Sequence, residues 1–256
     1  MIISVLNHKG GVGKTTTVHN LGAALANAGK TVLIADFDPQ CNLTSHCSRE
    51  KLINGIGYAV LNKSQAQPLP IKDNLWLLAG SEFLDEIAMQ WGHKPDLHTL
   101  HLHDVLKPIS NNYDYILVDT APGSSMLMIN AIFTADSLII PICDVDSIQG
   151  ARKITRLLQR HKISISGHYL ITRHDQRTLI SREMYSVLTQ KNKDAVFQTC
   201  IRATESIRQA AARKTDVISF SPNSNGAKDY INLAGEILST NTLIPQHYYK
   251  YNFLST

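Results

Sequence analysis

The run Lys9-Gly10-Gly11-Val12-Gly13-Lys14-Thr15-Thr16-Thr17 directly follows an apolar stretch, Met1 to Leu6, and opens a segment with helical character. This strand–loop–helix order is the context that a phosphate-binding P-loop requires. Glycines allow backbone N–H groups to converge on phosphate oxygens, and the helix adds its positive N-terminal end. The run therefore predicts a nucleotide site made by Gly10, Gly11, Val12, Gly13, Lys14, Thr15 and Thr16.

Two lysines stand in this loop, and they need different explanations. Lys14 is expected to reach the β- and γ-phosphates, and the Thr15 hydroxyl to ligate Mg²⁺. His8 occupies the position at which the usual G-x-x-x-x-G-K-[ST] pattern has its first glycine, and Lys9 is an additional cation. Since Lys14 already serves the same phosphates, Lys9 is best explained if it reaches a nucleotide on another copy of the chain.

The run resembles the deviant Walker A motif of the ParA/MinD family of P-loop ATPases. This resemblance implies that Lys9 contacts the partner's nucleotide in an ATP-sandwich homodimer. It also implies ATP and Mg²⁺ as cofactors, and a weak ATP hydrolase activity that depends on dimerisation.

Composition and length favour one α/β domain over residues 1–256, with a tail of uncertain structure from about residue 240. The chain has 256 residues, 43% of them hydrophobic, which is enough for a substantial core. No apolar run reaches the length of a membrane span, and the N-terminus lacks the layout of a signal peptide. The four cysteines include no C-x-x-C pair, so we expect reduced thiols and a cytoplasmic protein.

Apolar, β-rich runs alternate with helical stretches, the pattern of a doubly wound, mostly parallel sheet with helices on both faces. The expected strands are Ile2–Leu6, Thr31–Ala35, Leu75–Leu78, Tyr115–Val118, Ser137–Ile142, Tyr169–Thr172 and Val196–Thr199. The expected helices are Lys14–Ala28, Ile148–His161, Ser181–Thr189, Thr204–Ala212 and Ala227–Leu238. The segment Asn62–Asn74, with two prolines, is expected to be a loop.

Carboxylates follow two of these strands. Asp36 and Asp38 end the second strand in Asp-Phe-Asp-Pro-Gln, where they can order Mg²⁺ waters and the attacking water. Together with Asn42-Leu43-Thr44, this segment resembles the switch I of the ParA/MinD family. By that match Asp38 positions and activates water, and Asp36 supports the Mg²⁺ shell.

The strand before Asp119 follows the Walker B logic, in which an apolar strand ends in a carboxylate that meets the Mg²⁺ shell. Asp119 is therefore the fourth metal candidate, after Thr15, Asp36 and Asp38. Thr120 to Ser124 would form switch II and sense the γ-phosphate. The Asp-Thr-Ala-Pro-Gly sequence departs from the D-x-P-P of common ParA proteins and lies between ParA and MinD relatives.

The resemblance continues to about Leu238 with weaker motifs. The segments Tyr169–Thr178 and Val196–Ile201 match family segments that border the base. By analogy, Thr172, Arg173, Ile201 and Arg202 lie near the adenine, although Arg202 replaces the usual proline.

Positive charge is concentrated in the second half. Ser147 to Lys214 holds fourteen Lys/Arg and four Asp/Glu, a net of +10, whereas the whole chain has a net charge of +4. Such a segment suits a polyanionic partner, and solvated helix faces are the alternative. Since ParA dimers bind DNA nonspecifically through basic residues of this half, the DNA-contact candidates are Lys191, Lys193, Arg202, Arg208, Arg213 and Lys214. The Pro222–Gly226 loop, often basic in ParA proteins, carries Asn223 and Asn225 instead.

The favoured function is a ParA-type partition ATPase that binds the nucleoid and is released when a ParB-like or other small adaptor stimulates hydrolysis. No helix-turn-helix precedes the P-loop, so operator binding is not expected. A MinD-like membrane ATPase is the first alternative, but Pro245 interrupts the amphipathic C-terminal helix that such proteins use, and stable membrane association is not expected. A metabolic P-loop enzyme is the second alternative, which requires no basic segment.

A metal site at His93, His98, His101 and His103 is conceivable, but a solvated helical connection fits their spacing better.

Overall fold

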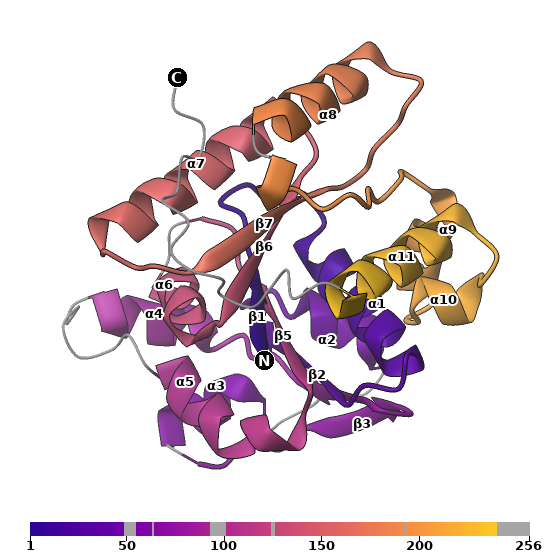
Figure 1. Ribbon diagram of the computed structural model, residues 1–256. Helices are drawn as coiled ribbons and strands as arrows, with labels where there is room; N and C mark the ends of the chain where they lie inside the picture. Colours follow the sequence, from indigo (N-terminus) through magenta and orange to yellow (C-terminus); the bar gives the residue numbers. More distant parts are fainter. Residues whose placement is uncertain (49–54, 63, 93–100, 124–125, 192, 240–256) are drawn as a thin grey trace.

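The computed structural model describes residues 1–48, 55–62, 64–92, 101–123, 126–191 and 193–239. Its strands form one seven-stranded sheet in the order β3-β4-β2-β5-β1-β6-β7, in which only β3 runs antiparallel to its neighbour (Figure 1). The strands are β1 (Ile2–Val5), β2 (Val32–Phe37), β3 (Leu69–Lys72), β4 (Leu75–Leu78), β5 (Tyr115–Thr120), β6 (Ser137–Ile142) and β7 (Ser166–Ile171). The predicted doubly wound α/β fold is confirmed.

Helices connect the parallel strands. They are α1 (Lys14–Asn27), α2 (Asn42–Cys47), α3 (Ile56–Asn62), α4 (Leu84–Gly92), α5 (His101–Leu106), α6 (Met126–Thr134), α7 (Val145–Arg160), α8 (Leu179–Lys191), α9 (Glu205–Ala212), α10 (Val217–Phe220) and α11 (Asn225–Ser239). Two 3₁₀ segments, Lys107–Asn112 and Lys193–Ala195, complete the described elements.

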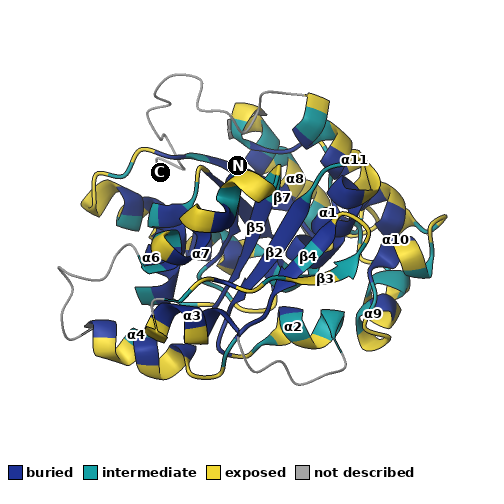
Figure 2. Cartoon of the chain, turned by 90° about the horizontal axis from the view of Figure 1, so that it is seen from below, coloured by how far each residue is buried: buried dark blue, intermediate teal, exposed yellow. Residues whose placement is uncertain are grey.

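Side chains of the strands alternate between two apolar layers, as the period of a strand requires. Ile3 and Val5 of β1 face a cluster with α1, α9, α10 and α11, whereas Ile2 and Leu6 face the opposite side. There, α3 to α6 cover one half of the sheet, and α6 to α8 cover the other. Figure 2 shows the resulting buried strands between two helical layers. The basic second half is thus divided, since α7 and α8 pack on one face and α9 on the other.

The strand order brings the predicted functional segments together. β1 lies between β5 and β6, and β2 follows β5, so the carboxyl ends of β1, β2 and β5 share one edge. In the register of β2 and β5, Asp36 is paired with Asp119. The P-loop after β1 therefore meets both carboxylates, as the general rule for open α/β sheets predicts.

Two expectations about the sheet were wrong. Val196–Thr199 is not a strand, because only Val196 bridges to Tyr169 and the Glu236 carboxylate accepts the N–H groups of Gln198 and Thr199 at 2.7 and 3.0 Å. The expected Asn62–Asn74 loop contains β3, which pairs with β4 across an irregularity between Pro70 and Lys72. Proline is tolerated there because β3 lies at the edge of the sheet and needs no further N–H donor.

One helix begins earlier than expected because a side chain caps its N-terminus. The helix expected from Ile148 begins at Val145, because Asp144 caps it and accepts the Ser147 N–H at 2.8 Å. Of the histidine-rich connection, residues 101–104 belong to α5, and residues 93–100 lie outside the described part. The predicted tail from residue 240 also lies outside it.

Candidate functional site

The P-loop joins β1 to α1 in a conformation that depends on glycine. Gly11 and Gly13 have φ values of +72° and +94°, in the left-handed region that L side chains rarely adopt. Gly13 is the N-cap of α1, and its carbonyl accepts the Thr17 N–H at 2.8 Å. The first turn of α1 thus presents its backbone N–H groups at the loop, as phosphate binding requires.

The side chain of the buried Asn7 holds the start of the P-loop in place through hydrogen bonds. Its amide donates to the carbonyls of Pro141 and Ser147 at 2.8 and 3.0 Å, and its side-chain oxygen accepts the Lys9 N–H at 3.0 Å. Gly150 of α7 packs directly on this arrangement, since a Cβ there would collide with the Asn7 side chain. The start of α7 is therefore docked against the P-loop backbone.

Lys14 is buried and lies among carboxylates. Its ammonium donates to the Lys9 carbonyl at 3.3 Å. Burial lowers the pKa of Lys14, and Asp119 and Asp38 oppose that change. The lysine is thus a desolvated cation at the mouth of the P-loop, where an anionic ligand gains most from it.

Asp119 is fully buried at the end of β5. Within the described residues neither of its carboxylate oxygens has a hydrogen-bond partner. Burial raises the pKa of Asp119 well above its usual value and Asp36 adds to this, while the Thr15 side chain and Lys14 offset part of it. An unpaired buried carboxylate of this kind fits a nearby cation or its water shell.

Asp36 has a different environment from Asp119. One of its oxygens accepts the Thr44 N–H at 2.8 Å and the Thr44 hydroxyl at 2.7 Å. The Thr44 hydroxyl also accepts the Gly80 N–H at 2.7 Å. Burial raises the pKa of Asp36 to about 6 despite these bonds. Asp36 therefore holds the segment that carries Asp38, an anchoring contact that the sequence did not indicate.

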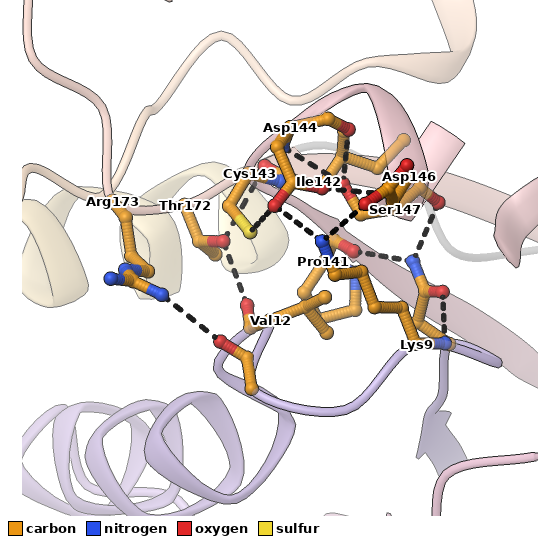
Figure 3. A network of polar contacts seen from close by, with 12 residues as sticks. Lys9, Val12, Pro141, Ile142, Cys143, Asp144, Asp146, Ser147, Thr172 and Arg173 are labelled. Carbon is orange, nitrogen blue, oxygen red and sulfur yellow. Dashed lines mark hydrogen bonds and ion pairs between the residues drawn. The ribbon is translucent and has the colours of Figure 1, made fainter. Parts of the chain in front are cut away.

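Lys9 turns away from the nucleotide loop. Its ammonium forms ion pairs with Asp144 at 2.7 Å and Asp146 at 3.2 Å, at the start of α7 (Figure 3). These carboxylates raise the pKa of Lys9, Asp144 most strongly. Neither Asp144 nor Asp146 was among the predicted site residues, because they lie about 135 positions further along the chain in a segment without a nucleotide motif.

A cavity of about 680 Å³ opens beside the P-loop. Its walls contain most of the predicted nucleotide residues: Gly10, Gly11, Gly13, Lys14, Thr15, Thr16, Asp38, Thr172, Arg173, Ile201 and Arg202. Four predicted residues lie outside its walls: Lys9, Val12, Asp36 and Asp119. Val12 is buried and contributes its carbonyl, which accepts the Thr172 hydroxyl at 2.8 Å.

Further wall residues were missed by the sequence interpretation. They are Gln40, Asn42, His46, Pro122, Ala203, Thr204, Glu205, Ile207 and Tyr230, together with Arg208, which was a DNA candidate. Gln40 and Asn42 stand in the switch I match and Pro122 stands in the switch II match, so those matches were usable signals. The others come from α2, α9, α11 and the loop before α9, where the resemblance carries no strong motif.

Two arginines at the far wall are held differently. Arg173 donates to the Gly11 carbonyl at 3.4 Å. Arg202 forms an ion pair with Asp229 at 2.6 Å, and its backbone N–H donates to the same carboxylate at 2.9 Å. Arg202 is therefore already paired with a carboxylate, which weakens its case as a DNA contact.

The other DNA candidates do not gather on one surface. Lys191 and Lys193 belong to the end of α8 and the following 3₁₀ turn, and their side chains lie outside the described part. Arg213 and Lys214 follow α9 on the opposite face of the sheet. The Arg213 guanidinium stacks on Phe220 at 4.8 Å, and the Lys214 ammonium donates to the Ser48 carbonyl at 3.1 Å.

Metal and membrane features are limited in the described ranges. No group of three His, Cys, Asp or Glu side chains is arranged there to hold a metal by itself. A hard cation at this site would thus draw ligands from water and phosphate oxygens besides the protein.

The helices among residues 1–239 that are described include none long and apolar enough to cross a membrane.

Comparisons with known proteins agree with this geometry. The family described as AAA domain matches residues 1–168. Sporulation initiation inhibitor protein Soj of Bacillus subtilis is 33% identical, with coverage of 92% of this chain and 97% of that protein. Chromosome-partitioning ATPase Soj of Treponema pallidum is 31% identical, with coverage of 91% and 95%.

A solved complex of Cyanothece McdA with ATP has the same fold, with a TM-score of 0.81 at 20% identity and coverage of 97% of this chain and 98% of that one. The P-loop, the carboxylates after β2 and β5 and the strand order are therefore consistent with the sequence similarity. That similarity extends over nearly the whole chain. The protein belongs to the ParA/MinD-type P-loop ATPases.

Proposed function

We propose that this protein is a ParA-type partition ATPase. In this proposal it binds ATP with Mg²⁺, forms a sandwich homodimer, and binds nonspecific duplex DNA in the dimeric state. A ParB-like or other small adaptor then stimulates hydrolysis and releases the DNA. The names of the Soj relatives, which refer to chromosome partitioning and sporulation control, support this class over a metabolic enzyme.

The position of Lys9 carries the proposal. Lys14 lines the nucleotide cavity, whereas the Lys9 ammonium lies outside it and pairs with Asp144 and Asp146. A self-sufficient ATPase has no use for a second P-loop lysine directed away from its own phosphates. Lys9 gains a role if it meets phosphates of a second copy, which would couple hydrolysis to dimerisation.

Within one copy the residues divide the chemistry of phosphoryl transfer to water. Lys14 and the N–H groups of Gly10 to Thr16 would hold the phosphates and offset their charge. Thr15 and Asp119 would hold Mg²⁺, directly or through water, and the unpaired Asp119 oxygens fit that role. When bound, Mg²⁺ neutralises charge on the transferred phosphoryl group.

Asp38 would orient the attacking water and accept its proton. One Asp38 oxygen accepts the Gln40 N–H at 2.9 Å, and the side chain lines the cavity near Lys14. Asp36, which holds Thr44, would fix the segment rather than meet the water. Thr172, Arg173, Ile201 and Arg202, on the cavity wall, would border the adenine.

Binding to random-sequence duplex DNA with ATP, ADP or no nucleotide, across a salt series, tests the proposal. We expect binding with ATP alone, falling steeply with salt because phosphate contacts release counterions. Binding without nucleotide dependence would contradict the proposed cycle. Absence of binding in all three states, together with ATP-dependent binding to anionic liposomes, would favour a MinD-like function and a membrane location instead of the nucleoid.

A further inference from the structure

Helix α7 carries an exposed row of cations that has no part in the nucleotide site. Arg152, Lys153, Arg156 and Arg160, here called the α7 ridge, are all exposed. The opposite side of the helix, with Ala151, Ile154 and Leu158, is buried in the core. At 3.6 residues per turn, the ridge occupies an arc of roughly 100° and spans about 12 Å along the helix.

The cations of the ridge have no carboxylate partners within the described residues, where the ion pairs join other groups. Arg152 and Arg156, like Arg156 and Arg160, are four positions apart, so they repel each other along the helix. Arginines of other elements, such as Arg177 and Arg202, have acidic partners. A row of unpaired like charges disfavours its own helix and suits an anionic partner that neutralises it.

The chemistry of the ridge favours a phosphate backbone. None of the exposed large apolar side chains lies between Arg152 and Arg160. A membrane-surface helix needs such side chains for insertion, and a protein interface needs them as central anchors. Arginine and lysine alone, in a regular row, are what neutralisation of successive phosphates requires.

We infer that the α7 ridge is the surface on which this protein binds the phosphate backbone of duplex DNA. The inference rests on the proposed function and moves the DNA contact away from Arg213 and Lys214. Figure 1 shows α7 and α9 at opposite sides of the molecule, and their apolar faces belong to different core clusters.

The first turns of α7, which precede the ridge, contact the P-loop. Asp144 and Asp146, at the start of α7, hold Lys9 (Figure 3). Gly150 of the same helix packs on the P-loop backbone. Lys153 also lies close enough to the loop to lower the pKa of His8, although burial of His8 contributes more. Movement of Lys9 toward a partner's nucleotide would change the contacts at the first turn of α7. DNA binding through this helix would therefore depend on the nucleotide.

The test compares three variants with the wild type in ATP-dependent binding to random-sequence duplex DNA over a salt series. The first combines Arg152→Ala, Arg156→Ala and Arg160→Ala, and the second changes the same three residues to lysine. The third combines Arg213→Ala, Lys214→Ala and Lys228→Ala, which removes three exposed cations on the opposite side. Sizing with ATP and basal ATP turnover without DNA monitor folding and dimerisation.

We expect the first variant to bind more weakly, with a log–log salt slope reduced by about 0.9 for each lost contact, or about 2.7 in total. The lysine variant should bind nearly as the wild type does, since the charges remain, and the third variant should keep its slope. Wild-type-like binding by the first variant, with loss in the third, would overturn the inference and leave the proposed function standing. Absence of ATP-dependent DNA binding by the wild type would overturn both.

Discussion

The Lys9 ammonium lies 2.7 Å from the Asp144 carboxylate, so the extra lysine of the P-loop is bound to the first turn of α7 within its own chain. Asp146 adds a second contact at 3.2 Å. In the proposed dimer Lys9 would have to exchange these carboxylates for phosphate oxygens. The two aspartates would then compete with the partner's phosphates for Lys9. The strength of the two ion pairs would therefore influence the protein concentration at which the dimer forms.

Neutralising the two aspartates should favour the dimer. Asparagine at position 144 keeps the side-chain oxygen that caps α7, so Asp144→Asn with Asp146→Asn removes charge with little effect on the helix. Because exposed ion pairs are weak, we expect the dimer dissociation constant with ATP to fall by about two- to tenfold. Sedimentation over a protein concentration series measures it. An increase in the constant would mean that the aspartates help to hold the dimer.

Lys9→Ala should separate nucleotide binding from dimerisation. Lys9 lies outside the cavity walls, so the affinity of one chain for ATP should stay within about threefold of the wild type. The ATP-dependent dimer should be lost, because no cation reaches the partner's phosphates. Nucleotide titration and sizing with ATP check the two parts. A dimer of normal stability would refute the cross-subunit role of Lys9.

Lys14→Ala should abolish productive nucleotide binding. Lys14 is buried in the cavity wall among carboxylates, so its removal leaves Asp38 and Asp119 to repel the phosphates. Loss of a charge-assisted contact in this setting should weaken ATP binding on the order of 100-fold. Fluorescence titration with a labelled ATP analogue measures this, with Lys30→Ala as a matched change of a lysine that is not in the cavity wall. Undiminished affinity would contradict the assignment.

Asp38→Ala should keep ATP bound and stop its turnover. The Asp38 side chain lines the cavity, but the phosphate-binding loop does not depend on it. Removing a group that positions and deprotonates water should slow hydrolysis on the order of 100-fold or more. Dimers would then accumulate with ATP, visible by sizing. Rapid turnover by this variant would exclude Asp38 from the mechanism.

His19, buried in α1, should make stability depend on pH. Burial is the main cause that lowers its pKa from 6.5 to about 4; Asp216 opposes this, whereas His46 and Lys72 add to it. The unfolded chain then binds more protons between these values, so stability falls as the pH drops through that window. The loss from pH 7 to 4 is roughly 3 kcal/mol.

Urea unfolding of the wild type and His19→Gln between pH 4 and 7 isolates this effect. Asp36, whose raised pKa gives the opposite trend, is present in both proteins and drops out of the difference. The wild type should lose stability relative to the variant as the pH falls. Parallel pH curves would contradict a buried, neutral His19.

The nucleotide loop and its carboxylates could be predicted because each lies within a short motif at the end of an apolar strand. Parallel strands bring such ends together, so Lys14, Asp38 and Asp119 were placed without knowledge of the tertiary structure. The contact of Lys9 with Asp144 could not be predicted, since it joins two loops far apart in the chain. Nor does chain order reveal which face a helix covers, so a basic segment that is continuous in the sequence is divided in the structure between α7 and α9 on opposite sides.

The edges of the sheet determine how copies of this protein can meet. At one edge Pro70 offers no N–H, and the pairing of β3 is irregular. At the other, the chain from Val196 to Ile201 covers β7, with the Phe197 and Ile201 N–H groups donating to Tyr169 and Ile171. Within the described part of the chain, both edges are thus poorly suited to pairing with a strand of another copy, so the sheet offers little opportunity for edge-to-edge aggregation, and contacts between copies are left to the helices and loops.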